Sequence, residues 1–139
     1  MGARMLTGHC LCGTVRYTIE GSPFGMYYCH CSQCRRASGS SFATNILVQA
    51  ERFRLTKGEE ALTAYESSPG KRRHFCSRCG SPIFNRQESA PGVLMVRCGS
   101  LDGDPGVRAQ AHIYVASKSP WFEICDDLPQ KREGLLSDS

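Results

Sequence analysis

The sequence predicts a mainly β protein, and three observations carry that prediction. Residues 14–20, Thr-Val-Arg-Tyr-Thr-Ile-Glu, alternate strictly between polar and apolar side chains, as a strand with one buried face does. Fourteen glycines and seven prolines supply many turns, and the helical periodicity is weak throughout. At this length we expect one domain over residues 1–139, with its core at about 7–129.

Further strands are predicted where short runs of apolar and β-branched residues lie between turn residues. They are expected at residues 26–28, 41–48, 53–56, 62–66, 72–75, 93–98 and 113–115. One short helix is expected at residues 32–38, where Gly39 would supply the glycine C-cap that ends many helices. The polar tail, residues 130–139, is predicted to fray.

The composition limits which cellular compartment and which partners we expect for this protein. The formal net charge is +4, an excess too small to indicate nucleic-acid binding. The N-terminal residues lack the apolar stretch of a secretory signal, and the longest apolar runs are far short of a membrane span. We therefore expect a cytoplasmic protein with no membrane partner. In that reducing compartment its nine cysteines are expected to be metal ligands or redox groups rather than disulfides.

Seven of the nine cysteines fall in three clusters. The clusters are Cys10-Leu11-Cys12, Cys29-His30-Cys31-Ser32-Gln33-Cys34 and Cys76-Ser77-Arg78-Cys79. On extended backbone, residues i and i+2 face the same side, so the first pair can point at one ion. In a C-x-x-C motif a tight turn brings the two sulfurs together. Two such pairs, Cys10/Cys12 and Cys76/Cys79, can supply the four thiolates of a tetrahedral zinc site.

The middle cluster combines both spacings, so Cys29, Cys31 and Cys34 offer three thiolates from one segment. Three protein ligands with one free position is the arrangement of a catalytic zinc. Seven clustered cysteines divide naturally into four and three, which favours two zinc ions per chain.

Other uses of these thiolates remain open from the residues alone. His30 or His74 could complete the middle site and close it, although His30 is expected to face away from the metal of its neighbours. Cys10 and Cys12 could instead join the middle cluster. Iron–sulfur ligation is a less favoured use of the same thiolates.

These motifs and their flanks resemble the glutathione-dependent formaldehyde-activating enzyme family, also called the centromere protein V/GFA domain. The resemblance is carried by residues 8–13 (GHCLCG), 29–35 (CHCSQCR), 75–81 (FCSRCGS), 99–102 (GSLD) and 112–121 (HIYVASKSPW). It implies an Mss4-like fold, in which zinc staples antiparallel β-sheets. It also implies a structural zinc on Cys10, Cys12, Cys76 and Cys79, and a catalytic zinc on Cys29, Cys31 and Cys34.

The resemblance further implies a carbon–sulfur lyase that forms or breaks S-(hydroxymethyl)glutathione. Its partners would be a small thiol or aldehyde, with glutathione as a co-substrate. The chemistry is consistent with the residues, because zinc with an open position can deprotonate a thiol or polarise an aldehyde oxygen. The alternative is a non-catalytic zinc module that binds a protein or nucleic acid. Such a module has no need of an incomplete zinc shell, so the middle cluster favours the enzyme.

Several residues outside the clusters are candidates for lesser roles. Cys98 and Cys125 are expected to be ordinary buried cysteines, with a disulfide or an extra ligand as alternatives. His112 is either a general acid or base near the open zinc or a packed structural residue. Lys118 and Trp121 could border a substrate cleft, although a tryptophan is more often part of the core.

Charged residues follow the same reasoning. Arg35 is the preferred candidate for binding glutathione carboxylates, because it directly follows a cluster cysteine. The basic run at residues 71–73 is expected to be solvated charge. Asp102 and Asp104 are expected to serve a turn.

Overall fold

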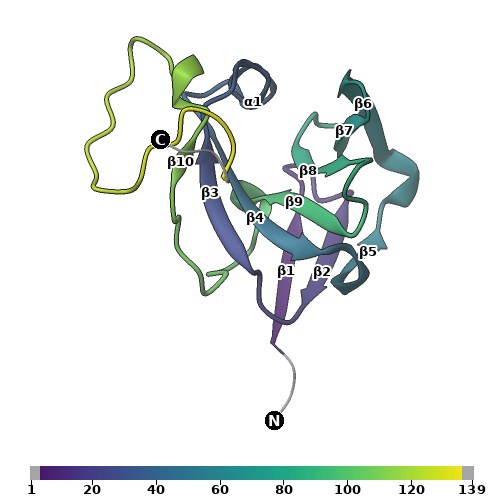
Figure 1. The fold of residues 1–139 in the computed structure, drawn as a ribbon. Coiled ribbons are helices and arrows are strands. Elements are labelled where there is room, and N and C mark those ends of the chain that lie inside the picture. Colours follow the sequence, from purple (N-terminus) through teal and green to yellow (C-terminus); the bar gives the residue numbers. More distant parts are fainter. Residues whose placement is uncertain (1–3, 136–139) are drawn as a thin grey trace.

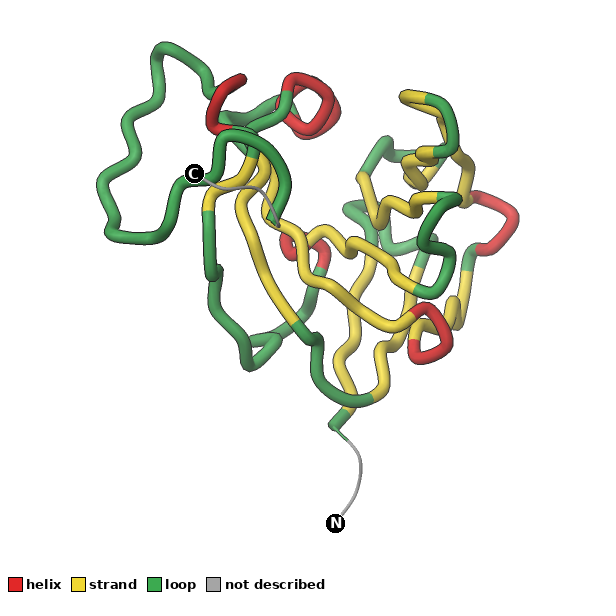
Figure 2. Tube along the Cα trace, in the orientation of Figure 1, coloured by secondary structure: helices red, strands yellow, loops and turns green. Residues whose placement is uncertain are grey.

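The computed structural model describes residues 4–135 and contains two β-sheets that pack against each other (Figures 1 and 2). The three-stranded sheet has the order β1-β2-β5 and consists of β1 (Met5–His9), β2 (Arg16–Glu20) and β5 (Phe53–Lys57). The seven-stranded sheet has the order β10-β3-β4-β9-β8-β7-β6. Its strands are β3 (Gly25–Cys29), β4 (Ala43–Gln49), β6 (Leu62–Ser68), β7 (Lys71–Cys76), β8 (Pro82–Gln87), β9 (Val93–Arg97) and β10 (His112–Ile113).

Helical structure is limited to short segments. They are α1 (Ser32–Ser38) and the 3₁₀ turns Ala50–Arg52, Glu59–Ala61, Cys98–Ser100 and Val115–Ser117. Within residues 4–135, none of these helices has the length and apolar character needed to cross a membrane. The predicted mainly β fold is confirmed, with one difference: β10 pairs with β3 in parallel, whereas the other strand pairs are antiparallel.

The main core lies between the two sheets. Alternating side chains of β2, Tyr17 and Ile19, meet Ile46 of β4 and Val96 of β9, and all four are 1% exposed or less. Because side chains alternate along a strand, the neighbouring residues of β4 and β9 point to the opposite face of the seven-stranded sheet.

That opposite face is buried too, and it carries polar groups. Register places Tyr27 of β3 opposite Asn45 of β4, and Asn45 opposite Arg97 of β9. Cys29 lies two residues beyond Tyr27 and opposite Ala43, so it belongs to the same face. The seven-stranded sheet therefore has one apolar face and one face on which chemistry-bearing side chains are buried.

Helix α1 forms as the sequence predicts. Its N-cap is Cys31, whose sulfur accepts a hydrogen bond from the Cys34 N–H at 3.2 Å. Its C-cap is Gly39 in the left-handed conformation, at φ 64°, which glycine adopts without a steric penalty. The helix start therefore fixes the spacing between two cysteines of the middle cluster.

The C-terminal tail differs from its prediction as far as residue 135. The His112 N–H donates to the Pro129 carbonyl at 2.9 Å, and the Lys131 N–H donates to the His112 carbonyl at 2.8 Å. The Tyr114 N–H donates to the Glu133 carbonyl at 2.8 Å. These bonds hold the tail beside β10 (Figure 1, yellow) instead of letting it fray. The rest of the predicted tail, residues 136–139, lies outside the described residues.

Candidate metal centres

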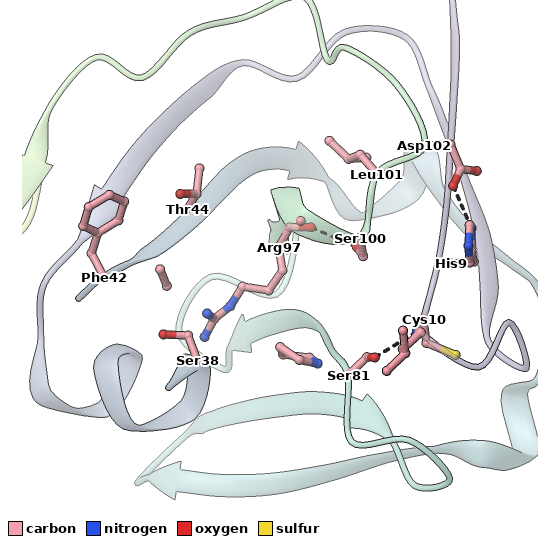
Figure 3. A pocket seen from close by; sticks show the side chains of 14 residues that line it. His9, Cys10, Ser38, Phe42, Thr44, Ser81, Arg97, Ser100, Leu101 and Asp102 are labelled. Carbon is pink, nitrogen blue, oxygen red and sulfur yellow. Dashed lines mark hydrogen bonds and ion pairs between the residues drawn. The ribbon is translucent and has the colours of Figure 1, made fainter. Parts of the chain in front are cut away.

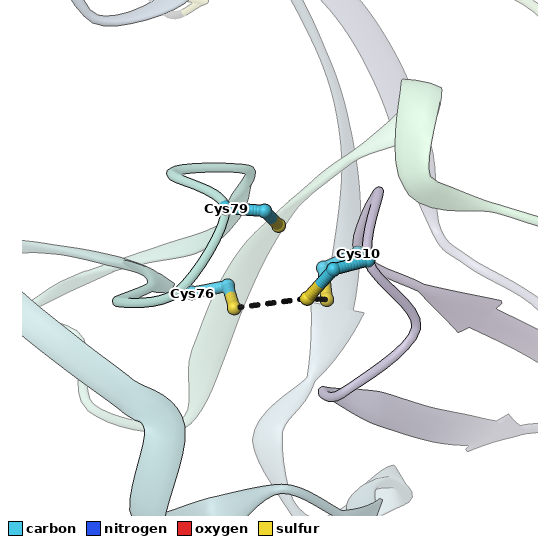
Figure 4. Close-up of side chains that lie close together, drawn as sticks. Cys10, Cys76 and Cys79 are labelled. Carbon is cyan, nitrogen blue, oxygen red and sulfur yellow. Dashed lines mark hydrogen bonds between the residues drawn. The ribbon is translucent and has the colours of Figure 1, made fainter.

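Four cysteines from two distant segments meet at one end of the sheets. Cys10 and Cys12 follow β1, Cys76 ends β7, and Cys79 lies in the turn after it (Figure 4). All four Sγ atoms lie within 4.8 Å of one another. The Cys10 and Cys12 sulfurs are 3.6 Å apart, and those of Cys12 and Cys76 are 3.9 Å apart. Zn–S bonds of about 2.3 Å in a tetrahedron imply S···S separations of about 3.8 Å, so the cluster fits zinc.

Hydrogen-bond donors around this cluster, from the backbone and from Ser81, stabilise thiolates. The Val15 N–H donates to the Cys10 Sγ at 3.2 Å, and a hydrogen bond from the Ser81 hydroxyl lowers the pKa of Cys79 to about 5. Cys10 and Cys76 are 1% and 0% exposed. A cation here would join the β1 end of the three-stranded sheet to the β7 end of the seven-stranded sheet.

The second cluster comes from a single segment. Cys29 is the last residue of β3, Cys31 caps α1 and Cys34 lies in its first turn, and their Sγ atoms are also within 4.8 Å of one another. Hydrogen bonds from the Cys29 and Cys34 thiols, together with the Cys34 N–H, hold the pKa of Cys31 far below its usual value. Among residues 4–135, no fourth Cys, His, Asp or Glu side chain joins this group.

Two open alternatives for the ligands of this second cluster are answered by where the residues lie. Cys10 and Cys12 belong with Cys76 and Cys79 and not with the middle segment. His74 stacks on Phe84, with ring centroids 4.2 Å apart, and does not join either cysteine group.

His30 points away from the cysteines, as expected, and begins a chain of hydrogen bonds. Its Nε2 lies 2.8 Å from His112 Nδ1, and His112 Nε2 lies 2.9 Å from Asp126 Oδ2. Both histidines are buried, and Phe42 packs against both rings. Burial lowers the pKa of His30 to about 4, and the hydrogen bond from His112 lowers that of Asp126. His112 is thus a buried residue whose side chain links Asp126 of the C-terminal loop to His30, which lies between Cys29 and Cys31 in the sequence.

Arg73 contradicts the expectation of solvated charge at residues 71–73. It is 7% exposed, and its Nη1 and Nη2 lie 3.7 and 3.8 Å from the Cys34 Sγ. Its Nε donates to the Ser67 hydroxyl at 2.9 Å, and Nη2 donates to the Gln33 side-chain oxygen at 3.3 Å. The alternation of β7 turns Arg73 inward between two more exposed neighbours, and it delivers positive charge to the second cluster.

Two further expectations are corrected. Trp121 is 70% exposed and does not belong to the core, although with Lys118 it lines a shallow surface hollow. Cys125 is exposed and Cys98 is half-buried, so neither is a fully buried cysteine, and none of the nine cysteines forms a disulfide. Arg35 donates through Nε to the Ser117 carbonyl at 3.1 Å, and its binding of a substrate carboxylate stays a prediction.

The two aspartates differ from each other. Asp104 serves the expected turn, since it accepts from the Gly106 N–H at 2.8 Å and pairs with Arg108. Asp102 does more than make a turn: its carboxylate accepts from the Thr7 hydroxyl at 2.7 Å and lies 2.6 Å from His9 Nδ1.

A pocket of about 530 Å³ extends from one cluster toward the other (Figure 3). Cys10 lines one side, and Ser38 and Ala43 line the other. Ser38 donates to the Cys34 carbonyl at 2.7 Å, and Ala43 is the register partner of Cys29. The pocket therefore borders the surroundings of both clusters, and sequence patterns gave no sign of it.

Known proteins have sequences similar to that of this chain. The sequence pattern of the glutathione-dependent formaldehyde-activating enzyme family matches residues 5–117. A protein of Halomonas elongata, named "Putative glutathione-dependent formaldehyde-activating enzyme", is 32% identical over 129 residues, which cover 86% of this chain and 81% of the relative. A Fusarium vanettenii protein of the same name is 28% identical over 57% of this chain and 42% of its own length.

A solved structure shares the fold. The crystal structure of a Rhodobacter sphaeroides protein superposes with a TM-score of 0.61 at 26% identity, covering 72% of this chain and 91% of that protein.

Proposed function

Because the chain belongs to the glutathione-dependent formaldehyde-activating enzyme family, we propose that it is a zinc-dependent carbon–sulfur lyase acting on a thiol–aldehyde adduct. The reaction would be the formation or breakdown of S-(hydroxymethyl)glutathione, the product of glutathione and formaldehyde. In the forward direction the thiol sulfur forms a bond to the aldehyde carbon, the C=O π bond breaks, and the thiol proton passes to the oxygen. The reverse direction returns both reactants.

Within this proposal the two clusters have different roles. Cys10, Cys12, Cys76 and Cys79 would hold a structural zinc, and Cys29, Cys31 and Cys34 would hold the catalytic one. The observation that carries the proposal is the incomplete ligand set of the second cluster: three converging sulfurs with no fourth Cys, His, Asp or Glu ligand among the described residues. A bound zinc there would supply a coordination position at which a substrate thiol loses its proton.

The surrounding residues support a thiol more than a hydroxide as the reacting group. Three thiolate ligands donate much electron density, which weakens the Lewis acidity that a potent metal hydroxide needs. Arg73 directs its guanidinium at the Cys34 sulfur, where it offsets part of the negative charge that a further thiolate adds.

Exchange spectroscopy tests this proposal directly. Two-dimensional exchange NMR on formaldehyde and glutathione should show faster exchange between free and adduct forms when the zinc-loaded protein is present. Cys31→Ser should remove the acceleration and leave the protein folded, because Cys31 serves the second cluster only. Cys125→Ser, at an exposed thiol outside both clusters, is the matched control and should retain it. Wild-type protein that fails to accelerate exchange would exclude this substrate pair.

A further inference from the structure

Arg97 ends β9 on the polar face of the seven-stranded sheet, and part of its guanidinium has no hydrogen-bond partner among the described residues. The residue is 5% exposed, yet its Nε and Nη2 are buried without a hydrogen bond to any described residue. No carboxylate of the described residues forms an ion pair with it. A buried guanidinium ordinarily has its donors satisfied, because an unpaired charge removed from water is strongly unfavourable.

Arg73 shows what a satisfied arginine looks like in the same region. It is about as buried as Arg97, but its donors reach Ser67, Gln33 and the Cys34 sulfur. Arg97 is thus not simply one of two equivalent counter-charges to the cysteine cluster. Its neighbour across the sheet, Asn45, leaves Oδ1 unpartnered, but one amide oxygen cannot satisfy the five N–H donors of a guanidinium.

The Arg97 guanidinium lies in the wall of the pocket of about 530 Å³. Figure 3 shows the Arg97 side chain extending into the pocket on the side of Ser38. Hydroxyls of Ser38 and Thr44 line the pocket near this side. The acidic residue of the pocket, Asp102, lies apart from Arg97 in this view and is already paired with His9.

The same pocket is lined by residues next to the proposed thiol site, although Cys29, Cys31 and Cys34 do not line it themselves. Ser38 donates to the Cys34 carbonyl, and Ala43, the register partner of Cys29, lies two residues from Asn45, the register partner of Arg97. A molecule with its sulfur at the second cluster would have Arg97 in the wall of the neighbouring pocket, and Nε and Nη2 of that guanidinium have no hydrogen bond to a described residue. The planar fork of a guanidinium matches the two oxygens of a carboxylate.

We propose that Arg97 is the specificity-determining residue of the substrate site, where it binds a carboxylate of the thiol substrate in this pocket. The inference rests on the proposed function, since it takes the thiol to lie at the Cys29, Cys31 and Cys34 cluster. It adds a requirement on the substrate: a thiol that bears a carboxylate binds better than a neutral thiol of the same length. No bond is made or broken at Arg97.

Two probes of equal chain length test the requirement: 3-mercaptopropionate and 3-mercapto-1-propanol. Binding of each is measured by titrating protein whose clusters hold cobalt(II), following the thiolate-to-cobalt absorption. Wild-type protein should bind the carboxylate probe at least about tenfold more tightly, as charge-assisted bidentate pairing allows. Arg97→Gln should remove most of this preference and leave the affinity for the alcohol within about twofold. Arg97→Lys should keep only part of it.

The control variant is Arg72→Gln, which removes the same charge from an exposed position on β7. It should preserve the preference for the carboxylate probe. Equal binding of both probes to wild-type protein would overturn the Arg97 proposal and leave thiol binding at the cluster intact, even if the Arg97 variants fail to fold. A preference that persists in Arg97→Gln, or a parallel loss of both affinities, would overturn it as well. Binding of neither probe to wild-type protein would overturn the proposed function together with the carboxylate site.

Discussion

The two cysteine clusters use one kind of ligand and differ in how the chain assembles them. The four-cysteine cluster joins segments 64 residues apart, Cys12 and Cys76, and its four sulfurs lie within 4.8 Å of one another. The three-cysteine cluster comes from the six residues from Cys29 to Cys34, where a strand end meets a helix start. One cluster therefore depends on the tertiary fold and would stabilise it, whereas the other is local and adds little to the joining of the sheets.

Under the proposed function, this difference means that the kind of ligand alone does not decide what a zinc site does. When the thiolates come from distant segments, the site exists only in the folded chain. The free energy of metal binding therefore stabilises the fold. When the thiolates come from one short segment, little chain entropy is lost in bringing them together. Such a site can leave one coordination position of the metal open without loss of the fold. The surroundings follow the same division, since buried arginine Arg73 accompanies only the three-cysteine cluster.

The largest effect should follow from breaking the four-cysteine cluster. Cys76→Ser removes a fully buried ligand, and structural zinc contributes about 10–16 kcal/mol in zinc-binding peptides, more than most domains have as net stability. We expect the cooperative thermal transition, followed by circular dichroism, to disappear. Cys125→Ser should change the unfolding free energy by no more than about 0.5 kcal/mol. A Cys76→Ser protein that melts close to wild type would mean that the two clusters do not differ in this way.

Stepwise chelation sharpens the comparison with an intermediate effect. We expect two zinc ions per chain, of which the one at the three-cysteine cluster leaves first as chelator is added, while the circular dichroism of the β-sheets persists. Metal analysis after dialysis at each chelator concentration gives the count. Simultaneous loss of both ions with unfolding would contradict the assignment of separate roles.

The smallest effect should come from Arg73→Gln, which removes the guanidinium beside the Cys34 sulfur. Groups that contact metal ligands typically change metal affinity about 10- to 100-fold. We expect about a tenfold weaker affinity at the three-cysteine cluster and an unchanged four-cysteine cluster, measured by competition with a coloured chelator. Arg72→Gln, at the exposed neighbour, should leave both affinities unchanged.

Local sequence signals predicted much of this architecture. The alternation at 14–20 and the glycine after residue 38 describe interactions between near neighbours, and the structure contains the strand and the capped helix. Two strands were missed. In β1, Gly8 replaces the expected large residue because the ring of Tyr17 occupies its place, and a methyl group there would collide with that ring. In β8, the buried Asn85 breaks the apolar alternation.

In the candidate site, too, local sequence patterns predicted some features, whereas others depend on tertiary packing. The C-x-C and C-x-x-C spacings encode convergent sulfurs locally, so the two clusters could be anticipated. The contacts of Arg73 with Cys34, and of His112 with Asp126, depend on how separate segments pack. Arg97 is the clearest case: it follows an apolar run, and nothing in that run indicates a buried charge facing a pocket.

The hydrogen-bonded tail covers the edge of the seven-stranded sheet, which limits how far the chain can be shortened. Strand β10 is the outermost member of its sheet, and an unprotected edge strand can recruit another chain through its free backbone groups. Residues 129–133 occupy such groups on His112, Tyr114 and Val115. A protein cut after Pro129 would uncover this border one strand away from Cys29, and self-association there would compete with correct folding of the segment that carries the three thiols.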